Sequence, residues 1–229
     1  MTETLWPKAV VFDLDGTLIE SLPDIQLATN RTLEDFGLAP LDDKTTRGFV
    51  GKGSRHLLTQ ALLHYGKVPE DEEIDYAYLR FLHHYGLAPN EAGYVFPGVT
   101  GTLRALTDAG HELAVCTNKP HAPTIQVMEA YGIGHFFDVI VGGDDVENRK
   151  PHPDHLLETT RRLKMDKADV VFVGDSENDI QASVAADIRS VLLTYGYSSL
   201  PHDSLGADVI VDTFPEVIGA IDTIVQARS

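Results

Sequence analysis

Six short runs of apolar residues recur along the chain, and each run is continuous rather than alternating with polar residues. The runs cover residues 9–12, 113–116, 139–141, 170–173, 190–193 and 209–211. A strand that is buried on both faces of a parallel sheet has this pattern, because helices cover both of its sides. The segments between the later runs predict helices over 99–109, 122–131, 153–163 and 180–186. The alternation of strands and helices after residue 98 therefore predicts an α/β fold with right-handed crossovers.

Residues 18–95 interrupt this alternation, since they contain helical patterns only. The spacing of apolar residues predicts helices over 24–36, 54–65 and 70–85. Glycine follows the first and the third of these helices, at Gly37 and Gly86, and glycine commonly ends a helix. The sequence thus predicts a helical insert directly after the first strand, joined to the rest of the chain by linkers near 17–22 and 86–97.

Polar residues follow four of the apolar runs, where strands are expected to end. In chain order they are Asp13, Asp15, Thr117, Asn118, Lys150, Asp175 and Asp179. In an open parallel sheet, ligands bind outside the carboxyl ends of the strands, which meet at one edge. One such residue by itself is usually a turn or helix-cap residue. The whole set, delivered in order by four strands, predicts a common site.

The paired aspartates at the end of the first strand indicate a cation. Side chains two residues apart on an extended strand point to the same side, so Asp13 and Asp15 face one site while Leu14 turns toward the core. Two unit charges 4 Å apart repel by about 4 kcal/mol at an effective dielectric constant near 20. A divalent ion offsets this repulsion, and with Asp175 the pair forms an oxygen-rich pocket for which Mg²⁺ is the natural candidate.

The composition narrows the classes of partner. The chain has 35 acidic and 18 basic residues and a formal net charge of −17, which disfavours nucleic acid and anionic membrane surfaces as partners. An anionic substrate therefore needs a local positive site or a bound metal. The single cysteine, Cys116, lies in an apolar run and is expected to be a core thiol. Neither a secretory signal nor a membrane span is expected, so we expect a cytoplasmic protein.

Four motifs carry a resemblance to a known family. They are "DLDGT" (13–17), "TN" (117–118), "KPHP" (150–153) and "GDSEND" (174–179). In this order they resemble the four motifs of the haloacid dehalogenase superfamily of phosphohydrolases, and the resemblance covers nearly the whole chain. Three further segments, 20–24, 50–58 and 96–99, look closest to bacterial phosphoglycolate phosphatases within that superfamily.

The resemblance implies a fold and a division into domains. The fold is α/β, with a Rossmann-like parallel sheet core and an inserted α-helical cap domain. The core would comprise residues 1–17 and 96–229, and the cap would comprise residues 18–95. The expected oligomeric state is a monomer or a homodimer.

The resemblance also implies roles for the motif residues. Asp13 would be the nucleophile that forms an aspartyl-phosphate, and Asp15 would be the general acid and base. Thr117 and Asn118 would hold the phosphoryl oxygens, and Lys150 would neutralise charge on the phosphate and on Asp13. Mg²⁺ would be held by the Asp13 carboxylate, the Asp15 main-chain oxygen and Asp175. Asp179 would orient Lys150.

The loop Gly51-Lys52-Gly53-Ser54-Arg55 is the candidate for substrate specificity in the cap. Its two glycines allow close approach of the backbone to a ligand, and a helix follows, whose first amides favour an anion. The alternative is an ordinary turn between helices. Resemblance to related caps favours Lys52 or Arg55 as the residue that reaches a distal carboxylate, as in 2-phosphoglycolate.

The leading function is therefore Mg²⁺-dependent hydrolysis of a small phosphate monoester, with 2-phosphoglycolate as the expected substrate. Inorganic pyrophosphatase, sugar-phosphate phosphatase and phosphomutase activities remain alternatives, since they need the same residues. An alternative from another class is a phosphoacceptor signalling module, which also combines an aspartyl-phosphate with Mg²⁺, threonine and lysine. The helical insert and the position of Asp13 in the first motif favour the enzyme.

Overall fold

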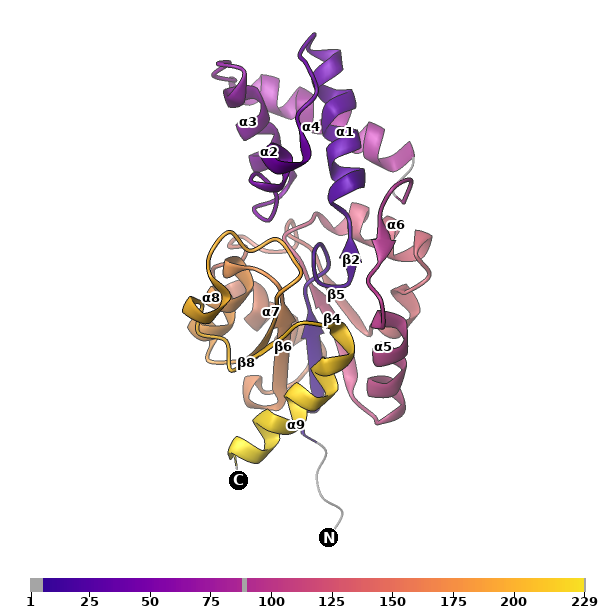
Figure 1. Cartoon of the computed structure of the whole chain (residues 1–229), viewed down its shortest axis with the longest axis vertical. Helices are drawn as coiled ribbons and strands as arrows, with labels where there is room; N and C mark the ends of the chain where they lie inside the picture. The colour runs from indigo at the N-terminus through magenta and orange to yellow at the C-terminus, as the bar shows by residue number, and fades with distance from the viewer. Residues whose placement is uncertain (1–5, 88–89, 229) are drawn as a thin grey trace.

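The computed structural model describes residues 6–87 and 90–228. The predicted core segment 1–17 and the predicted second linker 86–97 each include residues outside these ranges. The described chain forms two lobes, an α/β core and a smaller lobe of helices above it (Figure 1).

The core contains a six-stranded parallel sheet. Its strands are β1 (Ala9–Phe12), β4 (Glu112–Cys116), β5 (Val139–Val141), β6 (Val170–Gly174), β7 (Arg189–Leu193) and β8 (Val209–Val211). The strand order is β5-β4-β1-β6-β7-β8, so the first strand of the chain lies in the middle between β4 and β6. Every apolar run forms a strand, and the expected fold class is confirmed. The sequence order reverses beside β1, so ligands are expected at the carboxyl end of this strand.

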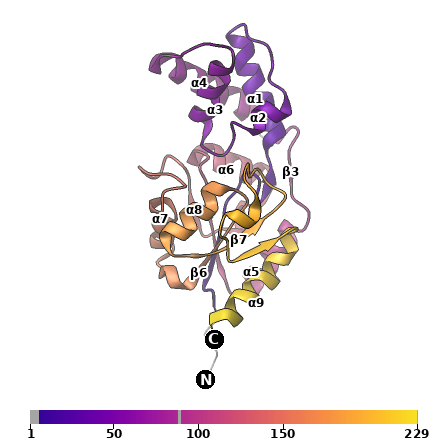
Figure 2. The same cartoon turned by 60° about the vertical axis from the view of Figure 1, so that its left-hand side comes forward.

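Helices cover both faces of this sheet. They are α5 (Val99–Asp108), α6 (His121–Ala130), α7 (Asp154–Leu163), α8 (Glu177–Ala186) and α9 (Val217–Arg228). Val10 and Phe12 of β1 pack in one apolar cluster with residues of α5, α6 and α9. Ala9 and Val11 pack in another with residues of α7 and α8. Figure 2 shows α7 and α8 on one side of the sheet and α5 and α9 on the other.

Several short or terminal elements were not predicted. The 3₁₀ helices are η1 (Gly134–Phe136), η2 (Lys167–Asp169), η3 (His202–Ser204) and η4 (Phe214–Glu216). The helix α9 was also missed, and α8 begins three residues before its predicted start. Its true start is set by a capping box, in which Ser176 and Asp179 each satisfy a backbone amide of the first turn.

The smaller lobe contains α1 (Leu22–Asp35), α2 (Asp43–Arg47), α3 (Ser54–His64) and α4 (Asp71–Leu87). These helices enclose an apolar cluster of their own, which includes Ile25, Leu33, Leu58, Leu62 and Phe81. We call this lobe the cap. The sequence predicted three of its helices, whereas α2 has five residues, too few to show a helical period.

The two connections between the lobes pair with each other. Strand β2 (Ile19–Glu20) lies antiparallel to β3 (Tyr94–Val95). The predicted domain boundaries fall beside this two-stranded ladder. No helix among the described residues has both the length and the apolar character that crossing a membrane requires.

Candidate active site

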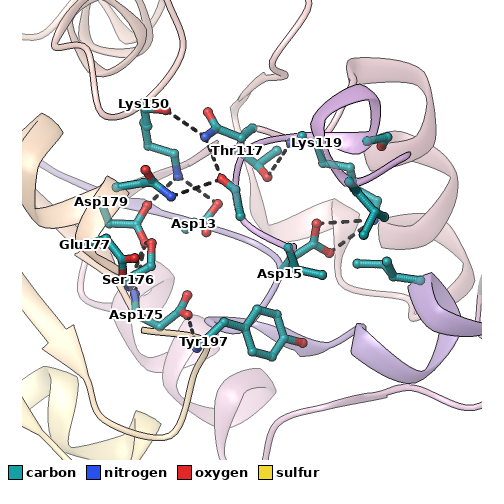
Figure 3. Close-up of a pocket in the computed structure, with 18 of the residues that line it drawn as sticks. Asp13, Asp15, Thr117, Lys119, Lys150, Asp175, Ser176, Glu177, Asp179 and Tyr197 are labelled. Atoms are coloured by element: carbon teal, nitrogen blue, oxygen red, sulfur yellow. Dashed lines mark hydrogen bonds and ion pairs between the residues drawn. The ribbon is translucent and has the colours of Figure 1, made fainter. Parts of the chain in front are cut away.

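A pocket lies between the cap and the carboxyl ends of the central strands (Figure 3). The cap residues that line it are Ile25, Val50, Gly51, Gly53, Ser54, Leu57 and Phe81. The core residues that line it are Asp13, Asp15, Thr117, Asn118, Lys119, Lys150, Asp175, Ser176, Glu177, Asn178, Asp179 and Tyr197. All the core residues that the sequence singled out for chemistry are therefore brought together at this edge of the sheet.

Asp13 lies at the floor of this pocket beside a buried lysine. Its Oδ1 atom is 2.9 Å from Lys150 Nζ, and the side chain of this lysine is 1% exposed. The same ammonium donates hydrogen bonds of 2.7 Å to Asp179 Oδ1 and to the main-chain oxygen of Cys116. Lys150 is thus held by three acceptors, one of which is Asp13, and this fixes a positive charge beside the Asp13 carboxylate.

Asp179 holds both Lys150 and the turn after β6. Its Oδ2 atom accepts hydrogen bonds from the main-chain amides of Asp175 and Ser176 and from the Ser176 hydroxyl, at 3.2, 3.0 and 2.7 Å. Its Oδ1 atom accepts from Lys150. Both oxygens are therefore engaged, and Asp179 contacts Lys150, the residue that the resemblance led us to expect it to orient.

Asp175 reaches the pocket from the end of β6. Its Oδ1 atom accepts a hydrogen bond of 2.7 Å from the Thr17 hydroxyl, and its Oδ2 atom accepts one of 2.7 Å from the Tyr197 amide. Burial raises the pKa of Asp175 well above its ordinary value, and the neighbouring carboxylates of Asp179 and Asp13 raise it further.

Asp13 and Asp175 together fit a hard divalent cation. Burial raises the pKa of Asp13 to about 7, against the opposing effect of Lys150. Asp13 Oδ1 is buried, and among the described residues it has no hydrogen-bond partner beyond this ion pair. Carboxylate oxygens of Asp13, Asp175 and Asp179 lie within 4.8 Å of one another. A divalent cation would stabilise these crowded anions, and carboxylate oxygen is the donor that such ions prefer.

Thr117 and Asn118 follow β4, and they use their polar groups differently. The Thr117 hydroxyl oxygen accepts a hydrogen bond of 3.2 Å from the Lys119 amide, which leaves its proton to donate into the pocket. The Asn118 side-chain amide donates bonds of 2.9 Å to the main-chain oxygens of Gly51 and Lys150. Asn118 therefore ties the cap loop to the core instead of directing its side-chain protons at a phosphoryl site.

Lys119 was missed by the sequence reading, although it follows Asn118 directly. It is 8% exposed and lines the pocket. Its ammonium lies 3.2 and 3.3 Å from the two oxygens of Asp15 and 4.4 Å from the ring centre of Tyr85, a residue of α4. Burial opposes the charge of Lys119, yet Asp15 and Tyr85 together outweigh it and raise the pKa of this lysine. The signal available in the sequence was its adjacency to a motif residue.

The cap loop lies over the pocket, but its two cations do not line it. Gly51, Gly53 and Ser54 line the pocket, and Gly51 accepts a further bond of 3.3 Å from the Asn178 side chain. Arg55 forms an ion pair with Asp75, and its guanidinium lies 5.0 Å from the ring centre of Tyr78. In this arrangement, Lys119 and Lys150 are the lysines and arginines among the described residues that line the pocket.

Known proteins are similar to this chain in both sequence and fold. The family model described as "Haloacid dehalogenase-like hydrolase" matches residues 10–193. A phosphoglycolate phosphatase of Rhodospirillum rubrum is 40% identical over 212 residues, which cover 91% of this chain and 88% of that protein. A crystal structure of a predicted phosphoglycolate phosphatase from Haemophilus somnus 129pt has a TM-score of 0.88 and 33% identity, and the match covers 93% of this chain and 97% of that one. A structure of CbbY from Rhodobacter sphaeroides in complex with phosphate has a TM-score of 0.83 and 26% identity, with 94% and 99% covered.

The chain belongs to the haloacid dehalogenase-like hydrolase family. It is an enzyme of the phosphatase type, a phosphoric monoester hydrolase, as the four motifs led us to expect. These findings favour an enzyme over the alternative of a phosphoacceptor signalling module.

Proposed function

We propose that this chain hydrolyses 2-phosphoglycolate to glycolate and phosphate, with Mg²⁺ as cofactor and a phosphorylated Asp13 as intermediate. The observation that carries the proposal is the pairing of two carboxylates with two buried lysines in one covered pocket. Asp13 lies beside Lys150, and Asp15 lies beside Lys119. The relatives named phosphoglycolate phosphatase support the choice of substrate.

In the first half of the reaction, a carboxylate oxygen of Asp13 attacks phosphorus, and the bond from phosphorus to the ester oxygen breaks. Lys150 neutralises charge on Asp13 and on the phosphoryl oxygens, and the Thr117 hydroxyl donates to one of those oxygens. Asp15 gives a proton to the departing glycolate oxygen. Asp13 and Asp175 would hold Mg²⁺, which would supply further positive charge at the phosphoryl site.

In the second half, water attacks phosphorus and Asp15 takes a proton from it. The bond from phosphorus to the Asp13 oxygen breaks, which releases phosphate and regenerates the free carboxylate. Asp15 would serve both steps, because in the second half water takes the place that the leaving oxygen had in the first.

The preference for a carboxylate-bearing substrate is assigned to Lys119. Lys150 already has three acceptors, whereas Lys119 has the Asp15 carboxylate at distances of 3.2 and 3.3 Å. A substrate carboxylate attached to the leaving oxygen would arrive next to Asp15, within reach of the Lys119 ammonium. This assignment differs from the expectation for Lys52 and Arg55, because those side chains lie outside the pocket walls.

The test is a set of initial rates with Mg²⁺ on phosphoglycolate, pyrophosphate, hexose phosphates and nucleoside monophosphates. We expect kcat/KM for phosphoglycolate to exceed that for every other compound by at least about tenfold, the value of one charged contact of about 1.4 kcal/mol. A higher value for pyrophosphate or for a hexose phosphate would overturn the substrate assignment. Conversion of a hexose phosphate into an isomer, without release of phosphate, would instead show a phosphomutase.

A further inference from the structure

The first helix of the cap lacks a capping side chain of its own. Ser21 occupies the N-cap position of α1, but its side chain makes no capping hydrogen bond. The Ser21 hydroxyl oxygen is buried and has no partner among the described residues. The first amides of a helix have no partner within the helix, so they need one from elsewhere.

Within the same segment, the Leu22 amide donates to Glu20 Oε1 at 3.1 Å. A second acceptor comes from the opposite lobe, 176 residues away in sequence. The Tyr197 hydroxyl accepts hydrogen bonds from the Ser21 amide at 3.1 Å and from the Leu22 amide at 3.0 Å. It also donates one of 2.5 Å to Glu20 Oε1, at the end of β2. A single phenol therefore joins the linker strand to the first turn of α1.

The backbone of the same tyrosine contacts Asp175, the proposed metal ligand. The Tyr197 amide donates a hydrogen bond of 2.7 Å to Asp175 Oδ2. The contact is close, since a Cβ atom on Gly196 would lie 2.2 Å from Asp175 Cβ, and one on Gly16 would lie 2.9 Å from Tyr197 Cδ2. Figure 3 shows Asp175 beside the backbone of Tyr197, with the ring extending away from it. Any displacement of the Asp175 carboxylate must therefore move Tyr197 as well.

A second cap residue touches the same loop. The Arg47 guanidinium lies 5.0 Å from the ring centre of Tyr197, and its Nη1 atom donates to the Gly196 oxygen at 3.3 Å. Arg47 belongs to α2, so two cap helices rest on this short core loop. The Arg47 contacts are available only while α2 lies against the core.

We infer that Tyr197 is a positioning residue that couples the cation site at Asp175 to the closed position of the cap. A cation held at Asp175 fixes the Tyr197 backbone, and the Tyr197 hydroxyl then fixes the start of α1. An empty cation site leaves the loop freer and the cap more readily opened. The inference rests on the proposed metal site, and it adds a link between that site and the covering of the pocket.

The variant Tyr197→Phe separates the two ends of this link. It removes the hydroxyl and keeps the amide that holds Asp175, so a change at α1 does not arise from loss of the metal ligand. Tyr195→Phe is the matched control. The Tyr195 hydroxyl donates to the Thr17 main-chain oxygen at 2.7 Å, so this change removes one hydrogen bond from the same loop without touching α1.

The first readout is amide hydrogen exchange with and without Mg²⁺ alone, measured over peptides that cover 19–26 and 172–179. In the native chain, we expect Mg²⁺ to slow exchange in both peptides. In Tyr197→Phe, we expect Mg²⁺ to slow exchange in 172–179 while 19–26 exchanges at least about fivefold faster than in the native chain, in line with loss of one net hydrogen bond. Tyr195→Phe should retain the native protection of 19–26.

Three results would overturn the inference. The first is native protection of 19–26 in Tyr197→Phe, and the second is a loss of that protection in Tyr195→Phe equal to the loss in Tyr197→Phe. The third is exchange in 19–26 of the native chain that does not change with Mg²⁺, while exchange in 172–179 does. If exchange in 172–179 does not change with Mg²⁺, both the proposed metal site and the coupling are contradicted. Phosphatase activity itself is tested separately, by the rate of hydrolysis of an aryl phosphate.

The second readout is the division between KM and kcat with p-nitrophenyl phosphate and Mg²⁺. A cap that closes less often should raise KM by about fivefold in Tyr197→Phe and change kcat by less than about twofold. A merely structural role would lower the fraction of folded enzyme, which lowers the apparent kcat and leaves KM unchanged. That second pattern would overturn the inference.

Discussion

Lys119 holds its ammonium 3.2 and 3.3 Å from the two carboxylate oxygens of Asp15, at the border between the core and the cap. The ring of Tyr85, from cap helix α4, lies 4.4 Å from the same ammonium. A buried cation beside the proposed acid and base is therefore in contact with the lobe that covers the substrate. From this position, Lys119 is expected to bind the carboxylate of the leaving group.

Replacing Lys119 by Met keeps the length of the side chain and removes its charge. We expect kcat/KM for phosphoglycolate to fall by about 10- to 100-fold, the size of a charged hydrogen bond of about 1.5–3 kcal/mol. The leaving group of p-nitrophenyl phosphate has no carboxylate. The factor by which its kcat/KM falls should therefore be at least about ten times smaller than the factor for phosphoglycolate. Steady-state rates on the two substrates measure this ratio.

Arg55→Ala is the matched control, because Arg55 is the cation that the sequence favoured and the structure pairs it with Asp75 outside the pocket walls. We expect a change of less than about threefold on either substrate. A selective loss on phosphoglycolate in Arg55→Ala, with none in Lys119→Met, would return the specificity role to the cap loop.

Most of the residues that the sequence located lie at the ends of buried strands. Asp13 and Asp175 follow continuous apolar runs, and such runs form strands wherever helices cover both faces of a sheet. Lys119 and Tyr197 lie in loops, where neither a period nor a spacing marks a side chain that turns inward. Both contact the cap, Lys119 through Tyr85 and Tyr197 through Arg47, and no local pattern contains such long-range contacts.

Removal of the divalent cation should stop turnover. Asp13 and Asp175 are buried carboxyl groups close together, and in their ionised form without a cation they repel the phosphate that must approach them. We expect excess chelator to reduce the rate to background and added Mg²⁺ to restore it, followed as phosphate release. Ca²⁺ should inhibit, because its larger and more flexible coordination shell disturbs in-line attack. Full activity in excess chelator would rule out the metal site.

His155 should make the folded state sensitive to acid. It is fully buried on α7, where Nε2 lies 3.3 Å from the Val141 oxygen and Nδ1 has no partner among the described residues. Burial, assisted by the charge of Lys150, lowers its pKa from 6.5 to about 4. Between these two values the unfolded chain binds a proton that the folded chain does not, so stability falls as the pH falls. The contribution reaches about 3 kcal/mol near pH 4.

Urea unfolding of the native chain and of His155→Gln at pH 7 and at pH 4.5 measures this contribution. The variant lacks the titrating group, so the difference between the two proteins isolates its effect. We expect the loss of unfolding free energy between the two pH values to be smaller in His155→Gln than in the native chain by about 2 kcal/mol. His152→Gln is the control, since that side chain is 51% exposed, and it should reproduce the native difference. Equal losses in all three proteins would refute the assignment.

The central claim is the covalent role of Asp13. The phosphoryl group that Asp13 would carry can be detected by mass spectrometry. Asp15→Asn should still allow Asp13 to attack an activated ester while it slows hydrolysis of the product, so a phosphorylated enzyme should accumulate. Asp13→Asn should lose at least about 10³-fold in kcat, because the amide cannot form the acyl phosphate.

The most direct measurement is intact-protein and peptide mass spectrometry of Asp15→Asn, quenched in acid during incubation with p-nitrophenyl phosphate and Mg²⁺. The account predicts one added phosphoryl group per chain, located on the peptide that contains Asp13 and absent from the double variant Asp13→Asn, Asp15→Asn. A phosphoryl group on any other residue, or an Asp13→Asn enzyme that keeps more than about a tenth of native activity, would contradict it.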